Sequence, residues 1–404
     1  SHQYNPGVIL AGKNTNEDSG SCYGMLFVYS GNFLVEAEKD QYDQTRIQMG
    51  LTDELFAYPL EAGAEFTAPE VILSYTNKGL SRLSQQYHHC IMNHICQGKY
   101  VHANRPVLIN SWEAAYFDFT GDTIVELAKE AKALGIDMVV MDDGWFGKRN
   151  DDNSSLGDWY VNEEKLGGTL TKLIERVNAE GVKFGIWIEP EMVSPKSELA
   201  EKHPEWIVKS GKRDIIPMRN QWLLDLSNPE VQDFVVKTFD EVIALSPDIS
   251  YIKWDANRHV DNFGSEYLSK ENQTHFWIDY TKGLYSVYER IRAKHPDVLI
   301  QLCSSGGGRL DFGALKYHDE FWASDNTNSL DRIFIQYSTN LFFPAKATAA
   351  HVSTTPNHQT GMMAPLKFRF DVAMTGRLGM ELQPKDLIGD ELPFAEQAMK
   401  NYKR

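Results

Sequence analysis

Three features that would assign the chain to a large class of proteins are scarce or missing. No apolar run approaches the roughly 18 residues that a membrane-spanning helix needs, so we expect no transmembrane segment. Basic charge is in deficit, because 40 Lys and Arg face 56 Asp and Glu and the formal net charge is -16. Nucleic acids and anionic membranes both attract a basic surface, so we expect neither as a partner. A neutral small-molecule ligand is compatible with this charge.

Cysteine is the third scarcity. The chain has four cysteines in 404 residues, without a C-x-x-C pair, at Cys22, Cys90, Cys96 and Cys303. Scattered thiols are typical of a reducing compartment rather than of a disulfide framework. The first residues, Ser1 to Pro6, are polar and contain no secretory signal of the charged-then-apolar kind. We therefore expect a cytoplasmic protein.

The first part of the chain is rich in short β-type runs. Residues 1–78 predict the remnant of an N-terminal β-sandwich. Tyr23–Tyr29 and Asn32–Ala37 flank Ser30-Gly31, which is typical of a hairpin turn. Further strand-like runs are Thr45–Met49, Leu60–Ala64 and Val71–Tyr75. The segment is too short for a complete large sandwich, so we expect its packing partners in the next domain or outside this chain.

Residues 79–105 have a mixed polar and apolar helical pattern and predict a connector. This connector contains His88, His89 and His94. A metal site is one interpretation of the three histidines, but no acidic or cysteine partner stands at ligand spacing with them. We therefore expect exposed or hydrogen-bonded imidazoles on a helix face.

Residues 106–404 alternate strand-like and helix-like segments. The strand candidates are Val107–Trp112, Met138–Trp145, Val182–Glu189, Tyr251–Asp255, Val298–Cys303, Phe321–Asp325, Ala347–Ser353 and Gly379–Leu382. The helix candidates are Asp122–Leu134, Leu170–Ala179, Val231–Leu245, Thr274–Lys294, Leu330–Phe343, Leu366–Gly376 and Glu391–Lys403. Eight such strands predict an α/β fold, a (β/α)8 TIM barrel preceded by the partial β-sandwich. The alternative, a doubly wound open sheet, requires a Gly-rich phosphate turn after an early strand, and the sequence has none.

Charged and aromatic residues gather where these strands end. Lys253, Asp255 and Asn257 occupy alternate positions and therefore one face of a strand. Similar strand ends are Trp112-Glu113, Asp142 to Trp145, Trp187 to Glu191, Cys303 to Arg309 and Trp322 to Asn326. In a barrel these ends meet at one rim. Charged groups that bind hydroxyls, together with aromatic rings that cover a sugar face, are what a carbohydrate site requires.

Asp255 and Asp325 are the best pair for cleaving a glycosidic bond, which needs one anionic carboxyl and one that carries a proton near neutral pH. The positive charge of Lys253 favours the ionised, nucleophilic form of Asp255. Asp325 follows the apolar Phe321-Trp322-Ala323, which is expected to raise its pKa and suit it as general acid and base. Asp325 is also a candidate cap for the next helix, but Asn328 can take that position and leave Asp325 free.

Other strand ends allow more than one chemistry. Asp142 and Asp143, with Asp151 and Asp152 nearby, resemble an oxygen-rich cation site, but sugar hydroxyls would also satisfy adjacent carboxylates. We favour the sugar and expect no metal.

The run Gly306-Gly307-Gly308 lacks the Gly-Lys-Ser/Thr ending of a phosphate loop, so we expect a tight turn that a ligand can approach. Cys303 is a potential nucleophile, but no histidine is placed by local sequence to activate it. We interpret it as a small contact residue.

Four motifs in combination resemble the α-galactosidases (melibiases) of glycoside hydrolase family 36. They are Met141–Gly147, Lys253–Arg258, Cys303–Asp311 and Trp322–Thr327. The likeness extends from about Trp112 to Pro384 and includes Pro356-Asn357-His358-Gln359.

The resemblance implies a retaining, cofactor-free hydrolase that removes terminal α-linked galactose from melibiose- and raffinose-type sugars. It implies that Asp255 is the nucleophile, that Asp325 is the acid and base, and that Asp142 and Asp143 hold galactosyl hydroxyls. The other implied sugar contacts are Trp112, Trp187, Arg219, Lys253, Asn257, Cys303 and Gly306.

Two departures from the family pattern stand out. Family members carry a large N-terminal β-sandwich and a small C-terminal β domain, whereas this chain is truncated at both accessory domains. Members are often tetramers in which a neighbour lines the site, so we expect a homo-oligomer, a tetramer, in the full-length form. Asn328 stands where many relatives have an acidic residue, and we expect this change to affect helix capping rather than chemistry.

Three rival functions follow from the same residues. The nearest is an α-N-acetylgalactosaminidase or a transglycosylating enzyme of the raffinose- or stachyose-synthase kind, and an acetamido group would need extra space beside Cys303 and Gly306. A non-catalytic sugar-binding barrel would lack one of the two carboxyls, and both are present. A metal-dependent barrel hydrolase is the third.

Overall fold

A closed barrel of eight parallel strands forms the centre of the computed structural model, which describes residues 3–216 and 218–404. Ser1 and His2, the start of the predicted sandwich remnant, lie outside the described residues. The barrel strands are β6 (Leu108–Asn110), β7 (Met138–Met141), β8 (Lys183–Ile188), β11 (Ile249–Trp254), β12 (Leu299–Leu302), β13 (Glu320–Trp322), β14 (Thr348–Ser353) and β15 (Arg377–Glu381). Each strand pairs with the next barrel strand along the chain, and β15 closes onto β6. The predicted TIM barrel is confirmed.

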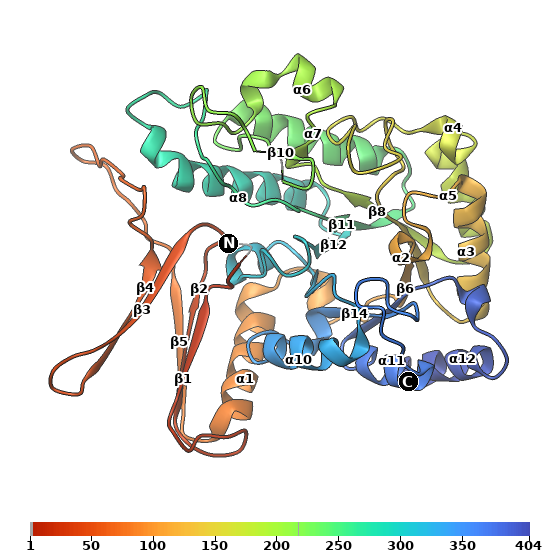
Figure 1. Cartoon of the computed structure of the whole chain (residues 1–404), viewed down its shortest axis with the longest axis horizontal. Helices are drawn as coiled ribbons and strands as arrows, with labels where there is room; N and C mark the ends of the chain where they lie inside the picture. Colours follow the sequence, from red (N-terminus) through yellow and green to blue (C-terminus); the bar gives the residue numbers. More distant parts are fainter. Residues whose placement is uncertain (1–2, 217) are drawn as a thin grey trace.

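The helices that follow the barrel strands in the chain surround the barrel (Figure 1). They are α3 (Gly121–Ala133), α5 (Leu170–Ala179), α7 (Pro229–Ala244), α8 (Phe276–Lys294), α10 (Ser329–Asn340), α11 (Leu366–Ala373) and α12 (Glu391–Tyr402). Their apolar residues recur at helical spacing; in α5 the buried ones are Leu170, Leu173, Ile174 and Val177. Burying each such side chain stabilises the fold by about 1.5–3 kcal/mol. Within the described residues, no helix has the length and apolarity to cross a bilayer.

The N-terminal segment forms two small antiparallel sheets, the red and orange strands of Figure 1. One contains β1 (Gly7–Ala11), β2 (Cys22–Phe27) and β5 (Val71–Thr76), and the other pairs β3 (Phe33–Lys39) with β4 (Thr45–Leu51). The predicted hairpin across Ser30-Gly31 is therefore wrong. Ser30 is held by the barrel domain instead, because its backbone N–H donates to Tyr285 Oη at 2.8 Å and its hydroxyl donates to Asp311 Oδ1 at 2.9 Å.

The predicted strand at Leu60–Ala64 is also wrong. These residues lie in the loop between β4 and β5, where the Ala64 N–H donates to the Glu61 carbonyl at 3.0 Å and closes a turn. The domain limits at residues 78 and 105 stay predictions.

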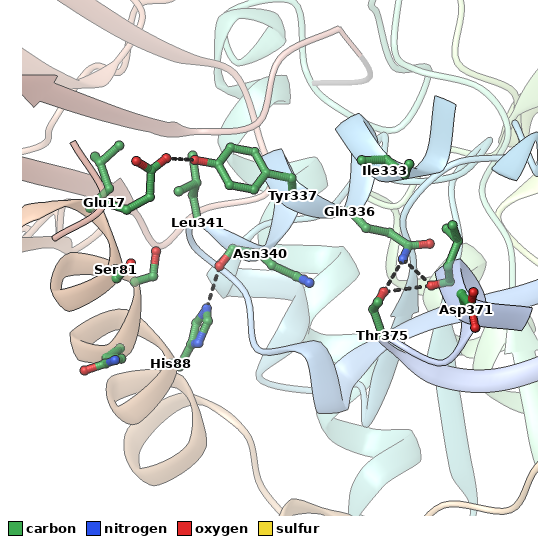
Figure 2. A pocket seen from close by; sticks show the side chains of 14 residues that line it. Glu17, Ser81, His88, Ile333, Gln336, Tyr337, Asn340, Leu341, Asp371 and Thr375 are labelled. Atoms are coloured by element: carbon green, nitrogen blue, oxygen red, sulfur yellow. Dashed lines mark hydrogen bonds between the residues drawn. The ribbon is translucent and has the colours of Figure 1, made fainter. Parts of the chain in front are cut away.

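The connector contains α1 (Gly79–Cys90), which packs beside the barrel helices. Its His88 bonds through Nε2 to the backbone oxygen of Asn340 at the end of α10, at 2.7 Å. A cavity of about 520 Å³ lies between α1, α10 and α11 (Figure 2), and a hydrogen bond from Tyr337 to Glu17 joins its walls. None of the predicted site residues lines this cavity, so the candidate site lies elsewhere.

Candidate active site

The predicted residues stand at the carboxyl-end rim of the barrel. Asp142 and Asp143 follow β7, Asp255 follows β11, Cys303 follows β12 and Asp325 follows β13. The first four of these residues are buried, and Asp325 is half-buried. Burial at one rim brings their charges into mutual range, since Asp255 acts on both Asp143 and Asp325.

Asp255 is held by three N–H donors. Its Oδ2 accepts from Trp187 Nε1 at 3.1 Å and from Asn257 Nδ2 at 2.8 Å, and its Oδ1 accepts from the Ala256 backbone N–H at 3.0 Å. Lys253 donates to Asp142 Oδ2 at 2.8 Å, and its positive charge also interacts with the charge of Asp255. Hydrogen bonds from uncharged groups therefore orient Asp255.

Asp325 lies in a different environment. Burial raises its pKa, and the negative charge of Asp255 raises it further, against the positive charges of Lys253 and Arg219. The direction is the one expected from the sequence. Asp325 Oδ1 accepts from Trp322 Nε1 at 3.0 Å.

Asn328 caps α10 by accepting from the N–H groups of Leu330 and Asp331, at 3.0 and 3.2 Å, so the capping prediction is confirmed.

Gly306 brings the loop after β12 against the start of the Asp325 loop. Its φ is +83°, and a Cβ at this position would stand 2.6 Å from Ser324 Cα. Only glycine fits this left-handed turn without displacing backbone. Neighbouring Cys303 is buried, and burial together with the charges of Asp255 and Asp325 raises the pKa of its thiol well above its ordinary value. A neutral thiol suits a contact residue better than a nucleophile.

Each carboxylate of the Asp142-Asp143 pair has its own cation. Asp142 Oδ2 accepts from Lys253 Nζ at 2.8 Å and from Asn110 Nδ2 at 2.7 Å. Asp143 forms a forked ion pair with Arg149, whose Nη2 and Nε lie 2.8 and 3.0 Å from the carboxylate oxygens. Burial raises the pKa of Asp143, and Arg149 opposes this shift.

The alternative cation site has little support. Asp151 accepts from the backbone N–H of Asn153 in its own loop, and Asp152 is exposed. In the described part of the chain, no group of three or more His, Cys, Asp or Glu side chains is arranged to hold a metal ion.

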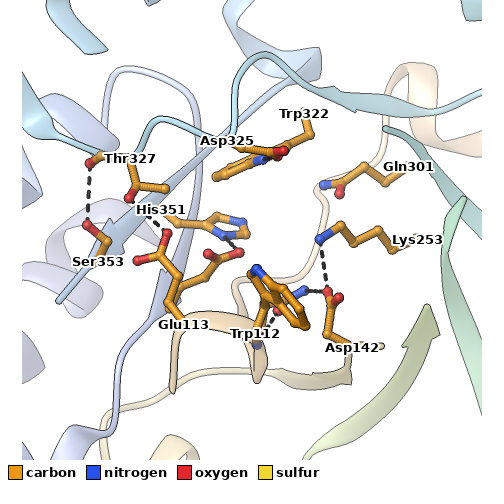
Figure 3. A network of polar contacts seen from close by, with 12 residues as sticks. Trp112, Glu113, Asp142, Lys253, Gln301, Trp322, Asp325, Thr327, His351 and Ser353 are labelled. Atoms are coloured by element: carbon orange, nitrogen blue, oxygen red, sulfur yellow. Dashed lines mark hydrogen bonds and ion pairs between the residues drawn. The ribbon is translucent and has the colours of Figure 1, made fainter. Parts of the chain in front are cut away.

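The two predicted tryptophans differ in exposure. Trp112 begins the short helix α2 (Trp112–Ala115) rather than ending a strand, and it is half-buried. Figure 3 shows its ring beside the ion pair of Asp142 and Lys253. Trp187 is buried against Phe146, with ring planes 9° apart, and reaches the site through its N–H to Asp255. Trp112 is therefore the one of the two with ring surface left open for a ligand.

Arg219 and Asn257 belong to one chain of hydrogen bonds at the rim. Arg219, whose φ is +53°, donates through Nη1 to Ser305 Oγ at 2.8 Å. The Ser305 backbone N–H donates to Asn257 Oδ1 at 2.9 Å, and Asn257 donates in turn to Asp255. Arg219 is exposed as a residue, while its guanidinium is partly desolvated and interacts with the charges of Glu189 and Asp255.

One buried carboxyl at this rim was not predicted as a site residue. Glu189 directly follows β8 and is 0% exposed. Its Oε1 accepts from the Asn257 backbone N–H at 2.6 Å, and its Oε2 accepts from Gln221 Nε2 at 2.9 Å. Burial, and then the charge of Asp255, raise the pKa of Glu189 to about 8. The available signal was its position in the strand end Trp187 to Glu191.

A second unpredicted group joins Glu113 and Glu381. Glu381 bonds through Oε1 to His351 Nδ1 at 2.9 Å, and Glu113 Oε1 accepts from Thr327 Oγ1 at 2.8 Å (Figure 3). Burial raises the pKa of Glu113 to about 7, and the nearby charge of Glu381 acts in the same direction. Because Glu381 lies near the end of the chain and Glu113 near the first barrel strand, only the folded barrel brings them together.

Two family models match the chain. One, described as Melibiase, covers residues 65–404, and the other, described as Glycosyl hydrolase family 36 N-terminal domain, covers residues 1–61. Among curated proteins, the bifunctional alpha-galactosidase/sucrose kinase AgaSK of Mediterraneibacter gnavus is 56% identical over 406 residues, covering 100% of this chain and 42% of the relative. Alpha-galactosidase AgaA of Geobacillus stearothermophilus is 46% identical, covering 100% and 55%. The chain thus spans about half the length of these relatives.

Solved structures of relatives share this fold. The crystal structure of the Geobacillus stearothermophilus family 36 enzyme AgaA superposes with a TM-score of 0.98 at 45% identity, covering 100% of this chain and 56% of that one. The galactosidase domain of AgaSK gives a TM-score of 0.95 at 56% identity, covering 100% and 55%. Variants of AgaA have been solved with stachyose and with raffinose.

Proposed function

The chain belongs to glycosyl hydrolase family 36, as its melibiase match over residues 65–404 establishes, and from this premise we propose that it is the catalytic part of a retaining exo-α-galactosidase. The substrates are oligosaccharides of the melibiose and raffinose type that end in α-linked galactose. The observation that carries the proposal is the contrast between two carboxyls at one rim. Asp255 is held by three N–H donors, while burial and Asp255 raise the pKa of Asp325.

The proposed reaction has two displacements. Asp255 attacks the anomeric carbon while Asp325 gives its proton to the departing glycosidic oxygen, which leaves galactose bound covalently to Asp255. Asp325, now ionised, removes a proton from water, and the water oxygen displaces Asp255. Both displacements invert the anomeric carbon, so the galactose is released with its α configuration. This geometry requires the two carboxyls to be about 5–5.5 Å apart.

Two ion pairs are suited to hold the sugar. Asp142 with Lys253, and Asp143 with Arg149, present oriented acceptors and donors to hydroxyls without an uncompensated buried charge. We propose that they bind the galactosyl hydroxyls, that the open face of Trp112 covers the ring, and that Arg219 lies toward the rim. Trp187, Asn257, Cys303 and Gly306 complete the walls.

The relatives support this assignment in one further way. The AgaA variants bound to stachyose and to raffinose each carry a different aspartate substitution. These two aspartates are separated by as many positions as Asp255 and Asp325 are. The same spacing in a chain of the same fold supports the same pair.

The test is to incubate the full-length protein with melibiose and follow the anomeric protons by NMR before mutarotation. We expect α-galactose to appear first. Initial release of β-galactose would contradict the covalent step, and no hydrolysis would contradict the function. Assaying an aryl α-N-acetylgalactosaminide beside the aryl α-galactoside distinguishes an α-galactosidase from an α-N-acetylgalactosaminidase. The buried Cys303 and the tight turn at Gly306 support a substrate with the smaller 2-hydroxyl group.

Two wider expectations belong to the same proposal. We propose that the full-length protein is a homo-oligomer, a tetramer, which light scattering tests. We also propose a cytoplasmic location, which fits the free thiols of Cys22, Cys90, Cys96 and Cys303.

A further inference from the structure

Glu189 differs from three other buried carboxyls at the rim in its partners. Asp142, Asp143 and Glu191 are each ion-paired, with Lys253, Arg149 and Arg309. Among residues 3–216 and 218–404, no Lys, Arg or His forms an ion pair with Glu189, although it is fully buried. Its two hydrogen bonds come from uncharged donors, the Asn257 backbone N–H and Gln221 Nε2.

Glu189 is linked to Asp255 through a single residue. Glu189 accepts from the Asn257 backbone, and the Asn257 side chain donates to Asp255 Oδ2 at 2.8 Å. The backbones are joined as well, since the Asp255 N–H donates to the carbonyl of Ile188, the residue before Glu189, at 2.8 Å. Both carboxyls are buried, and burial disfavours two anions joined through one residue, although the charge of Arg219 acts on both of them.

We propose that Glu189 is a positioning residue that keeps its proton at neutral pH, holding Asn257 onto Asp255 while leaving Asp255 as the only anion of the two. This inference rests on the proposed function, in which Asp255 is the nucleophile. Three charged groups face Glu189: Asp255 after β11, Arg219 in the loop before β10 (Trp222–Leu223), and Arg149 in the loop after β7. Burial and Asp255 favour the protonated acid, and the two arginines oppose it.

The proton needs an acceptor, and Gln221 provides one. Gln221 Oε1 is a buried oxygen without a hydrogen-bond partner in the described structure. Half a turn of the amide places this oxygen where Nε2 now stands, 2.9 Å from Glu189 Oε2. A protonated Glu189 can then donate to Gln221 while its Oε1 still accepts from Asn257.

The first test compares Glu189→Ala with Glu189→Gln in the full-length protein, using p-nitrophenyl α-galactoside. Alanine frees Asn257, so we expect kcat to fall about 30-fold or more while KM changes less than about threefold. Glutamine keeps the shape and hydrogen bonds of the protonated acid, so we expect it to restore kcat to within about threefold of the wild type. A glutamine variant as slow as the alanine variant would overturn the protonated state. A normal kcat for the alanine variant would overturn the positioning role.

The second test does not depend on activity. The folded protein retains a proton on Glu189 that the unfolded chain releases, so this residue lowers stability as pH rises from about 4.5 to about 8. We therefore expect Glu189→Gln to raise the unfolding temperature by an amount that grows across this pH range. Parallel curves for the two proteins would show an ionised Glu189 and overturn the proposal.

Glu191→Gln is the matched control for stability. Glu191 accepts from Arg309 at 2.6 and 2.9 Å, so the same substitution there leaves a buried guanidinium unpaired and should lower the unfolding temperature. If the wild type does not hydrolyse α-galactosides, the proposed function fails and the positioning role fails with it. The unfolding curves still decide whether Glu189 holds its proton.

Discussion

The two sides of the candidate site hold the same chemical group in opposite ways. On the side of β8 and β11, N–H groups of Trp187, Asn257 and Ala256 donate to Asp255. On the side of β13, the donor that the described structure gives to Asp325 is Trp322 Nε1. Donors stabilise the charged form of a carboxyl, whereas burial without them stabilises the neutral form. The difference teaches that hydrogen-bond partners, not residue type, divide the work between two aspartates.

The supporting residues differ in the same sense. Asn257, which donates to Asp255, is itself held by Glu189, and Glu189 accepts a second hydrogen bond from Gln221. No charged donor takes part in these contacts. Arg332 supports the Asp325 loop with a positive charge. Its guanidinium lies 4.4 Å from the centre of the Trp322 ring, and its Nε donates to the Asn326 carbonyl at 2.7 Å. A fixed cation in the Asp325 loop holds backbone in place without donating to the carboxyl itself.

Asp255→Asn should have the largest effect, because an amide cannot serve as the leaving and attacking group of a double displacement. We expect kcat/KM to fall on the order of 10⁴-fold or more, for both raffinose and aryl galactosides. Steady-state kinetics on the full-length protein measure this. Asp297→Asn, an exposed aspartate paired with Lys99, is the control. Raffinose hydrolysis near the wild-type rate would remove Asp255 as nucleophile.

Asp325→Ala should have a smaller effect that depends on the leaving group. For raffinose, which needs protonation, we expect a loss of about 10²–10⁴-fold, and for an aryl galactoside with an acidic phenol a much smaller loss in kcat/KM. Azide should restore turnover and yield α-galactosyl azide, because it attacks the face opposite the bond to Asp255. Formation of the β-galactosyl azide would mean that the roles of the two aspartates are exchanged. An equal loss on both substrates would mean that Asp325 is not the general acid.

Much of the fold was predictable because its signals are local. Strands such as Met138–Met141 are wholly buried and read as continuous apolar runs, and the Asn328 cap lies beside the helix it starts. The Ser30-Gly31 hairpin failed because Ser30 is bound by Tyr285 and Asp311, 255 and 281 positions away. A turn signal cannot report a partner so distant in the chain.

The site shows the same limit. Asp255 and Asp325 were predicted to share one rim because strand ends converge in any such barrel, and both follow barrel strands. Lys253 was assigned to Asp255, and the two charges do interact, but the ion pair of Lys253 is with Asp142, 111 positions away. Glu189 was seen at its strand end, yet its importance depends on Gln221 and Asn257, which reach it from separate loops. Pairings between loops are decided by barrel geometry, which the sequence carries only indirectly.

Trp187→Phe removes one donor from Asp255 and keeps an aromatic ring in the packing against Phe146. We expect kcat to fall about tenfold, because the carboxylate is less well oriented and hydrogen bonds to charged groups are worth about 1.5–3 kcal/mol. Steady-state kinetics on an aryl galactoside measure this change. A kcat equal to that of the wild type would show that the Trp187 N–H does not orient the carboxylate.

Trp322→Phe makes the corresponding change at Asp325, and we expect it to have the smallest effect. Burial and Asp255 raise the pKa of Asp325, and the Trp322 N–H is among the groups that act against this rise. Phenylalanine removes that donor, so the pKa of Asp325 should rise further. In the proposed mechanism activity requires protonated Asp325 and falls as pH rises through this pKa. The alkaline limb of kcat/KM for raffinose should therefore move to higher pH while the acidic limb stays in place. If Trp322→Phe moved the acidic limb instead, Asp325 would not be the group that carries the proton.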